Sequence, residues 1–486
     1  MSISNAMNNA YSGLSAMSRS AETVSNNVSN ALTEGYSRQQ VEYSATVLGN
    51  QGSGVGIEGI TRSEDALITR LRRNASADFA NTSTKSDALA RLAGVLGEPG
   101  DSGALAVRYA AFEDALSLAV SAPDSVALQQ GILVAAKNLT STFNQISTEV
   151  SRVRLDADTR IVRDVETVNT ALKQIESLNA KIRALSLSGL NISALEDQRQ
   201  MAVDRVNSII PVRQTKADNG DVAIFSQGGE VLLNGSARKL EFTQTHLIMP
   251  SMTLSSGALS GLSVNGKPVD VGIFGRAVDG GSLSANFLVR DTIAPKFQVR
   301  LDALSADLIE RFQDPSIDPT MLLGDAGMFT NTGAYYSSLD EIGISGRISV
   351  NPSVDPANGG EIWRLRDGVG AVTQGIVGES AQLIRMASAL VDIRPASTNL
   401  GLAIAMSGVG FAEETTSFWV SESFRTEEDH AYKQSLHSSL RSEELQAVGV
   451  DTDKEMQSLL VIEQAYAANA RVISVLDGLM RKLLEM

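Results

Sequence analysis

The chain has 486 residues, of which 43% are hydrophobic and 20% are charged, and its formal net charge is −15. The length is enough for about three domains, and the acidic balance argues against nucleic acid or an anionic membrane as a partner, because both attract basic patches. The sequence contains no cysteine, which excludes disulfides, thiol catalysis and cysteine-ligated metal sites.

Targeting segments are not expected either. No apolar run approaches the roughly 18 residues of a transmembrane helix. The first Lys or Arg is Arg19, and no continuous apolar stretch lies near the N-terminus, so we expect no cleaved secretory signal peptide. If the protein leaves the cell, it uses another route.

The first thirty residues carry an apolar stripe at alternating spacings of four and three. Its members are Ile3, Met7, Ala10, Leu14, Met17, Ala21, Val24 and Val28. This heptad pattern predicts a helix that packs along another helix. Fourteen of the first thirty residues are Ser or Asn, which together cost about 7 kcal/mol of helix propensity relative to Ala. We therefore expect this segment to be disordered until a partner covers it.

Beyond this helix, which we expect to end near Glu34–Tyr36 with Gly35 at its C-terminus, residues 37–43 are predicted to be extended. A glycine-rich strand or loop over 52–60 follows. From 64 to about 210 the pattern is helical, with interruptions at 97–100 and 122–124. The longest helix, which should end at Gly189, contains a stutter over 153–165 that would locally unwind a supercoil.

At Pro211 the pattern changes to short β-runs separated by Gly and Asn turns. These runs are 221–225, 231–235, 240–242 and 262–266. Helices are predicted again over 283–291 and 295–312, then an irregular region over about 314–362, and helices over 369–391 and from 415 onward. The stretch 399–411 is rich in Gly and Ala and receives no assignment.

A second heptad stripe ends almost at the last residue. It consists of Leu459, Ile462, Tyr466, Asn469, Ile473, Leu476, Met480 and Leu483. Two terminal stripes that each need a partner suggest that the two end helices pair with each other. The alternative is that the two helices contribute separately to an ordinary core.

The expected fold is mainly α, with terminal coiled-coil helices, a long-helix bundle and a small inserted β domain. The expected domains are residues 1–35 plus 447–486, residues 36–210 plus 280–446, and residues 211–279. Because helices on both sides of the insertion belong to one bundle, its ends near Pro211 and Gly280 should lie close together. We also expect the insertion to be dispensable for folding of the helices.

Motifs that could support catalysis or ligand binding are weak. Gly261–Lys267 matches most of a phosphate-binding loop, but Pro268 stands where a Ser or Thr is needed. Asn265-Gly266 is instead a strong hairpin signal.

The three histidines, His246, His430 and His437, lack the spacing of a metal site and are expected on the solvated surface. No nucleophile elbow occurs, and no pair of carboxylates is marked as buried. We expect no catalytic, cofactor-binding or metal-binding residue, no cofactor, and no enzymatic activity.

Several segments carry a recognisable pattern, namely Asn8–Leu14, Ser25–Asn30, Leu195–Arg199, Gly280–Leu283 with Arg290-Asp291 and Pro295, and Glu463–Ile473. These segments resemble bacterial flagellar axial proteins, and most of all the hook-associated protein 1 family. The most specific is the motif Gly35-Tyr36-Ser37-Arg38-Gln39, because rod and hook subunits usually continue differently after the Gly-Tyr pair. The resemblance covers both termini and most of the helical body.

The resemblance implies a structural protein at the hook–filament junction, outside the cell, exported through the flagellar type III route without a cleaved signal. The terminal helices would assemble with copies of the chain and meet the hook protein and the second junction protein or filament subunits. An export chaperone would bind the C-terminal helix, and the isolated chain would be a monomer. The alternatives are a hook or filament subunit, or a secreted enzyme carried on an axial scaffold.

Overall fold

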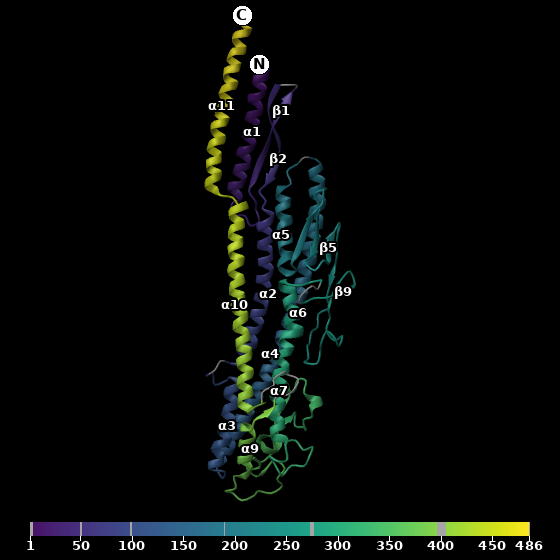
Figure 1. Cartoon of the computed structure of the whole chain (residues 1–486), viewed down its shortest axis with the longest axis vertical. Helices are drawn as coiled ribbons and strands as arrows, with labels where there is room; N and C mark the ends of the chain where they lie inside the picture. Colours follow the sequence, from purple (N-terminus) through teal and green to yellow (C-terminus); the bar gives the residue numbers. More distant parts are fainter. Residues whose placement is uncertain are drawn as a thin grey trace.

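The computed structural model describes residues 3–48, 51–97, 100–188, 190–272, 277–395 and 405–485. The molecule is long and narrow, with both termini at one end and helices α3 and α9 at the other (Figure 1). Gly189, the predicted end of the longest helix, and residues 399–404 of the unassigned stretch 399–411 lie outside the described residues.

Helices dominate the fold, as the sequence predicts. They are α1 (Ile3–Asn30), α2 (Ala66–Leu96), α3 (Leu105–Ser121), α4 (Val126–Leu187), α5 (Ser193–Ile209), α6 (Gly281–Leu288), α7 (Ala294–Gln313), α8 (Arg364–Asp367), α9 (Ala381–Val391), α10 (Gly408–Val448) and α11 (Thr452–Leu484). The two predicted interruptions before α4 are present, and α4 remains one helix of 62 residues through the predicted stutter.

The strands form small antiparallel sheets. The first is a hairpin of β1 (Gln39–Leu48) and β2 (Gln51–Arg62), and the second has the order β3 (Val212–Lys216), β4 (Val222–Ser226), β5 (Val231–Asn234) and β6 (Ser236–Ala237). The third contains β7 (Leu240–Glu241), β8 (Leu262–Val264) and β9 (Lys267–Val269), and two further pairs are β10 (Phe329–Asn331) with β11 (Ile348–Val350) and β12 (Arg394–Pro395) with β13 (Ala405–Met406).

The hairpin expected at Asn265-Gly266 is confirmed. These two residues have φ values of 49° and 74° and connect β8 to β9, which pair in an antiparallel register. Positive φ at both central positions is the requirement of a type I′ turn, which Asn-Gly meets best. The segment is a turn and not the start of a helix, so the partial phosphate-loop match has no structural counterpart.

Three predicted helix boundaries are wrong. Helix α1 ends at Asn30, although Gly35 does have the expected positive φ of 77°. The helices predicted over 283–291 and 295–312 form one continuous rod through a π-turn at Val289–Ile293, because Pro295 lies in the first turn of α7, where its missing N–H is tolerated. Residues 369–380 are not helical. In that region Gly370 passes so close to Thr320 that a Cβ would lie 2.3 Å from the Thr320 carbonyl oxygen.

Two apolar clusters stabilise the body, and α4 contributes to both. One contains the first half of α4, with residues of α2, α3, α7, α9 and the start of α10. The other contains the second half of α4 from Ile161 to Ile175, with residues of α5 and α6 and the inward side chains of β3, β4, β5, β7 and β8. Burial of these side chains provides most of the favourable free energy of the fold.

The ends of the inserted segment lie close together, as expected, since a Cβ on Gly280 would be 2.9 Å from Cγ of Pro211. The expectation that 211–279 is an independent, dispensable domain does not agree with the packing. Its buried residues, such as Ile224, Leu233 and Leu262, belong to the same cluster as α4 and α5. Alternating strand residues on one face of a small sheet need a partner surface, and here the helices provide it.

Replacement of residues 212–279 by a short Gly/Ser linker is therefore expected to destabilise the chain. The uncovered side chains of α5 and of the second half of α4 would be exposed to water, at about 25 cal/mol per Å² of apolar surface. We expect a lower melting temperature by circular dichroism and rapid proteolysis of α5. A matched control replaces only the exposed turn 254–258 and should melt like the native chain. If both variants melt at the same temperature, the insertion is an independent domain, as the sequence predicts.

Candidate assembly surface

Helices α1 and α11 lie side by side at the end of the molecule that holds both termini (Figure 1). In α11 the stripe is the covered face: Leu459, Ile462, Asn469, Ile473 and Leu476 are half-buried, whereas nearly all other residues beyond Glu455 are exposed. Tyr466, Met480 and Leu483 belong to the same stripe but are more exposed, at 42–59%. A Cβ on Gly13 would lie 2.9 Å from Nδ2 of Asn469, so the backbone of α1 passes close to the α11 stripe.

The stripe of α1 is covered less evenly. Ala10 and Val24 are buried, Met7 and Val28 are exposed, and the remaining members, Ile3, Leu14, Met17 and Ala21, are half-buried. The sequence predicts that the N-terminal helix pairs with the C-terminal helix and indicates no other partner for it. The structure adds the β1–β2 hairpin, which packs beside α1.

A second, polar face of α1 is more deeply buried than the apolar stripe. Ser20, Thr23 and Asn27 are all buried, and Ser20 hydrogen-bonds the hydroxyl of Tyr43 in β1. Near the other end of the helix, Ser12 Oγ accepts the backbone N–H of Val55 in β2 at 3.1 Å. The heptad pattern does not reveal this face because it counts only apolar residues. The buried Ser and Asn side chains are instead paired by hydrogen bonds with the hairpin and with the backbone of α1 itself.

The most connected part of the terminal unit is Asn27, around which the Gly35–Gln39 motif folds. Asn27 Oδ1 accepts the Tyr36 hydroxyl at 2.9 Å and the Gln39 N–H at 3.0 Å. Its Nδ2 donates to the Gln39 carbonyl at 2.9 Å and to Glu455 Oε2 at 3.1 Å. The motif thus connects α1, the start of β1 and the start of α11 through one buried amide.

Glu455 is fully buried at the start of α11, and a buried carboxylate requires a charged partner. Arg38 supplies it, with Nε 2.5 Å from Glu455 Oε1. The backbone of Arg38 also donates to the carbonyl of Val448, the last residue of α10. The motif therefore holds both sides of the short α10–α11 connection.

The motif also contacts the helical body. The Ser37 N–H donates to Asp197 of α5, which is also paired with Arg62 at 3.0 Å. Burial, reinforced by the nearby carboxylates of Asp197 and Glu455, raises the pKa of Tyr36 to about 12. Its hydroxyl consequently remains a hydrogen-bond donor at all physiological pH values. A Cβ on Gly35 would lie 2.5 Å from Met201 Cγ of α5, and the positive φ of Gly35 also favours glycine at this position.

The remaining faces of α11 are open and rich in apolar side chains. Val461, Val472, Val475 and Leu479 are between 45% and 66% exposed, and their spacing places them on one side of the helix.

An 18-residue window within Gly408–Leu484 reaches a mean hydropathy of 1.3, which corrects the expectation that no segment has the length and composition of a membrane span. None of that window is buried in the single chain.

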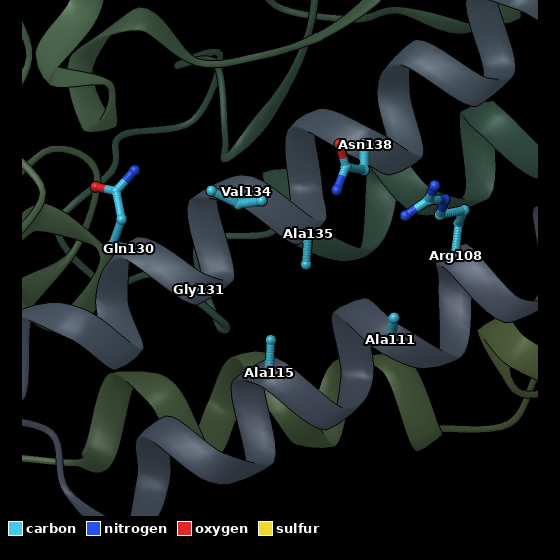
Figure 2. A pocket seen from close by; sticks show the side chains of 8 residues that line it. All are labelled: Arg108, Ala111, Ala115, Gln130, Gly131, Val134, Ala135 and Asn138. Carbon is cyan, nitrogen blue, oxygen red and sulfur yellow. The ribbon is translucent and has the colours of Figure 1, made fainter. Parts of the chain in front are cut away.

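The other feature that could bind a ligand lies at the opposite end of the molecule. Figure 2 shows a hollow of about 390 Å³ between α3 and α4, lined mainly by small side chains such as Ala111, Ala115 and Ala135. Arg108 is the charged residue of this lining. The lining therefore offers no acid–base pair.

The histidine prediction is wrong for two of the three residues. His246 is exposed as expected, but His430 and His437 are half-buried at the α2–α10 contact, where both stack on Phe79. In the described part of the chain no group of three potential metal ligands occurs.

Comparison with known proteins identifies two matching family models. The flagellar hook-associated protein FlgK helical domain matches residues 89–325. The C-terminal region of the flagellar basal body rod FlgEFG proteins matches residues 441–486, which contain α11 and its stripe.

Individual proteins are also similar to this chain. The flagellar hook-associated protein 1 of Bacillus subtilis (strain 168) is 24% identical, over 98% of this chain and 96% of that protein. The protein of that name in Escherichia coli (strain K12) is 28% identical over 54% of this chain and 52% of its own length. The flagellar hook junction protein FlgK of Burkholderia pseudomallei, a solved structure, has a TM-score of 0.42 and 19% identity, covering 54% of this chain and 46% of that one. With matches along nearly its whole length, this chain is similar to the flagellar hook-associated protein 1 family.

Proposed function

We propose that this chain is a structural subunit of the bacterial flagellum that joins the hook to the filament through its terminal helices. The role is mechanical and not enzymatic. The observation that carries the proposal is the unequal coverage of α11. One stripe faces α1, whereas Val461, Val472, Val475 and Leu479 remain exposed. A soluble chain rarely presents so long an apolar face unless another surface covers it.

In the assembled junction the open face of α11 would pack on terminal helices of neighbouring copies, with hook protein on one side and the second junction protein or filament subunits on the other. The chain would be exported without a cleaved signal peptide. An export chaperone would cover the same apolar face of α11 before assembly, since that face is available in the single chain and would otherwise promote aggregation.

Immuno-electron microscopy of isolated flagella tests the location directly. Antibody against this chain should label only the boundary between hook and filament. Label along the filament or the hook would instead favour the alternative of a filament or hook subunit. The same cells without the gene serve as the labelling control.

Limited proteolysis of the purified chain tests the state before assembly. We expect a monomer in which residues 1–35 and 450–486 are cleaved first, because α11 packs mainly on α1 and, among its described residues, has a single fully buried side chain, Glu455. The body from α2 to α10 should resist cleavage. Size-exclusion chromatography with mass spectrometry of the fragments provides the measurement. An oligomer in dilute solution with both ends protected would contradict this expectation.

A further inference from the structure

The long contact between α2 and α10 changes character along its length. From Gly408 to Trp419, α10 inserts buried side chains such as Phe411 and Ala412 into an apolar cluster. From residue 420 to its end at Val448, all of which the structure describes, α10 has no buried side chain. We call residues 420–448 the α10 strap.

Polar contacts hold the strap on the body. Arg72 of α2 pairs with Glu444 at 2.7 Å. Lys433 pairs with Asp78 at 2.9 Å. The Ser86 hydroxyl donates to Glu427 at 2.6 Å. Partly exposed ion pairs of this kind contribute about 0–1 kcal/mol each, so the strap lacks the apolar anchor that fixes the lower part of α10.

The centre of the strap is an aromatic sandwich. His430 and His437 are seven residues apart, which on a helix separates them by about 10.5 Å along the axis. Phe79 of α2 lies between them, with its ring centroid 5.4 Å from that of His430 and 5.5 Å from that of His437. The ring planes differ by only 19° and 9°. Each imidazole therefore covers one face of the same phenyl ring.

Charged groups surround this sandwich on every helix that packs there. They are Arg72, Asp78 and Lys85 on α2, Asp204 on α5, Asp279 before α6, and Glu427, Asp429, Lys433, Arg441 and Glu444 on α10. The carboxylates of Asp204 and Glu444 are already engaged by Arg72. Arg441 in turn pairs with Glu34, which follows α1, at 3.2 Å. A proton on His437 would thus add a positive charge close to two guanidinium groups, Arg72 and Arg441, whose carboxylate partners are already engaged.

We propose that the α10 strap is a pH-sensitive fastening, in which protonation of His437 in mild acid releases residues 420–448 from α2. Because the strap leads directly into α11, its release would leave the terminal assembly helix held to the body by α1 and by the contacts of the Gly35–Gln39 motif. This inference goes beyond the junction role and does not depend on it.

The direction follows from the position of the ring. Burial, followed by the charges of Arg441 and Arg72, lowers the pKa of His437 below its usual value of 6.5. The released strap then binds a proton more readily than the docked strap. The free energy that favours the docked strap is at its full value above pH 6.5. It decreases as the pH falls from 6.5 toward the lowered pKa of His437. One such histidine increases the opening equilibrium by up to about tenfold between pH 7.5 and pH 5.5.

Hydrogen–deuterium exchange of the full chain, corrected for the pH dependence of chemical exchange, measures this opening. Between pH 7.5 and pH 5.5 we expect protection within 420–448 to fall by up to about tenfold, while residues 408–419 stay protected. His437→Gln and His437→Leu cannot titrate in this range and should remove the pH response. His246→Gln is the matched control, because His246 is exposed, and should keep it.

An unchanged pH response in both His437 variants would overturn the proposal, because the response would then come from carboxylates. So would a native chain whose strap is equally protected at both pH values. If the strap is already open at pH 7.5 in these variants, the proposal is tested instead by NMR titration of the His437 ring in the native full chain. A titration midpoint below 6.5 that coincides with strap opening supports the proposal, whereas a midpoint at or above 6.5 refutes it.

Discussion

Replacement of Arg290 by alanine is expected to lower the free energy of unfolding by about 3–5 kcal/mol, since it removes one partner of a fully buried ion pair. Arg290 is completely buried in the π-turn between α6 and α7, with Nη1 2.7 Å from Oδ1 of the equally buried Asp158 on α4. It also donates to Asp291 and to the Ser260 carbonyl. The substitution would leave the Asp158 charge without its cationic partner, held mainly by the Thr245 N–H at 2.8 Å.

Urea denaturation followed by circular dichroism provides the measurement. The control is Arg183→Ala, which removes a solvent-exposed pair with Asp221 and should cost less than about 1 kcal/mol. The double variant Arg290→Met with Asp158→Asn should lose less than the sum of the two single changes, because no unpaired charge remains. Strict additivity, or equal effects of Arg290→Ala and Arg183→Ala, would show that the buried pair is not coupled as described.

Substitution of Ile473 by aspartate is expected to abolish assembly while hardly changing the isolated chain. Ile473 lies in the middle of the α11 stripe and is only half-buried against α1, so its loss in the monomer is small. In an assembly, burial of the carboxylate would add a desolvation cost to the loss of about 2 kcal/mol of apolar contribution. The defect recurs in every copy, so junctions should not form and cells should release unpolymerised filament subunits.

Melting temperature and flagellar assembly must be measured on the same variant. Ser474→Asp introduces the same charge at an exposed polar position of α11 that lies on neither the stripe nor the open apolar face, and it should leave swimming intact. Val475→Asp, on the open apolar face, should block assembly without any effect on the monomer. A large drop in melting temperature for Ile473→Asp in cells that still swim would mean that α11 serves only the core of its own chain.

The sequence predicts the helical elements well where periodicity is strong and fails where packing is polar. Both terminal stripes follow from apolar spacing, and the interruptions before α4 follow from the Gly and Pro residues within 97–100 and 122–124. The buried face of α1 with Ser20 and Asn27 does not, because its burial depends on hydrogen bonds to a hairpin that lies next in the chain. The same is true of Glu455, whose burial is possible only because Arg38 and Asn27 reach it.

The remaining errors concern relations between distant segments. Alternation predicts the strands of 211–279, but it does not say that their inner faces meet α4 and α5. The Gly35–Gln39 motif is recognisable as a family feature, yet its contacts join residues more than 400 positions apart, such as Arg38 and Glu455. Single-sequence patterns describe neighbours along a helix or strand, and these contacts are made between elements.

The participation of α4 in both apolar clusters has a mechanical consequence. A helix of 62 residues is about 93 Å long at 1.5 Å per residue, and its two halves are embedded in different clusters. A bending or twisting load applied at one end of the body must deform this rod before the clusters can move apart. The continuous helix therefore makes the body resist bending and twisting between its two clusters.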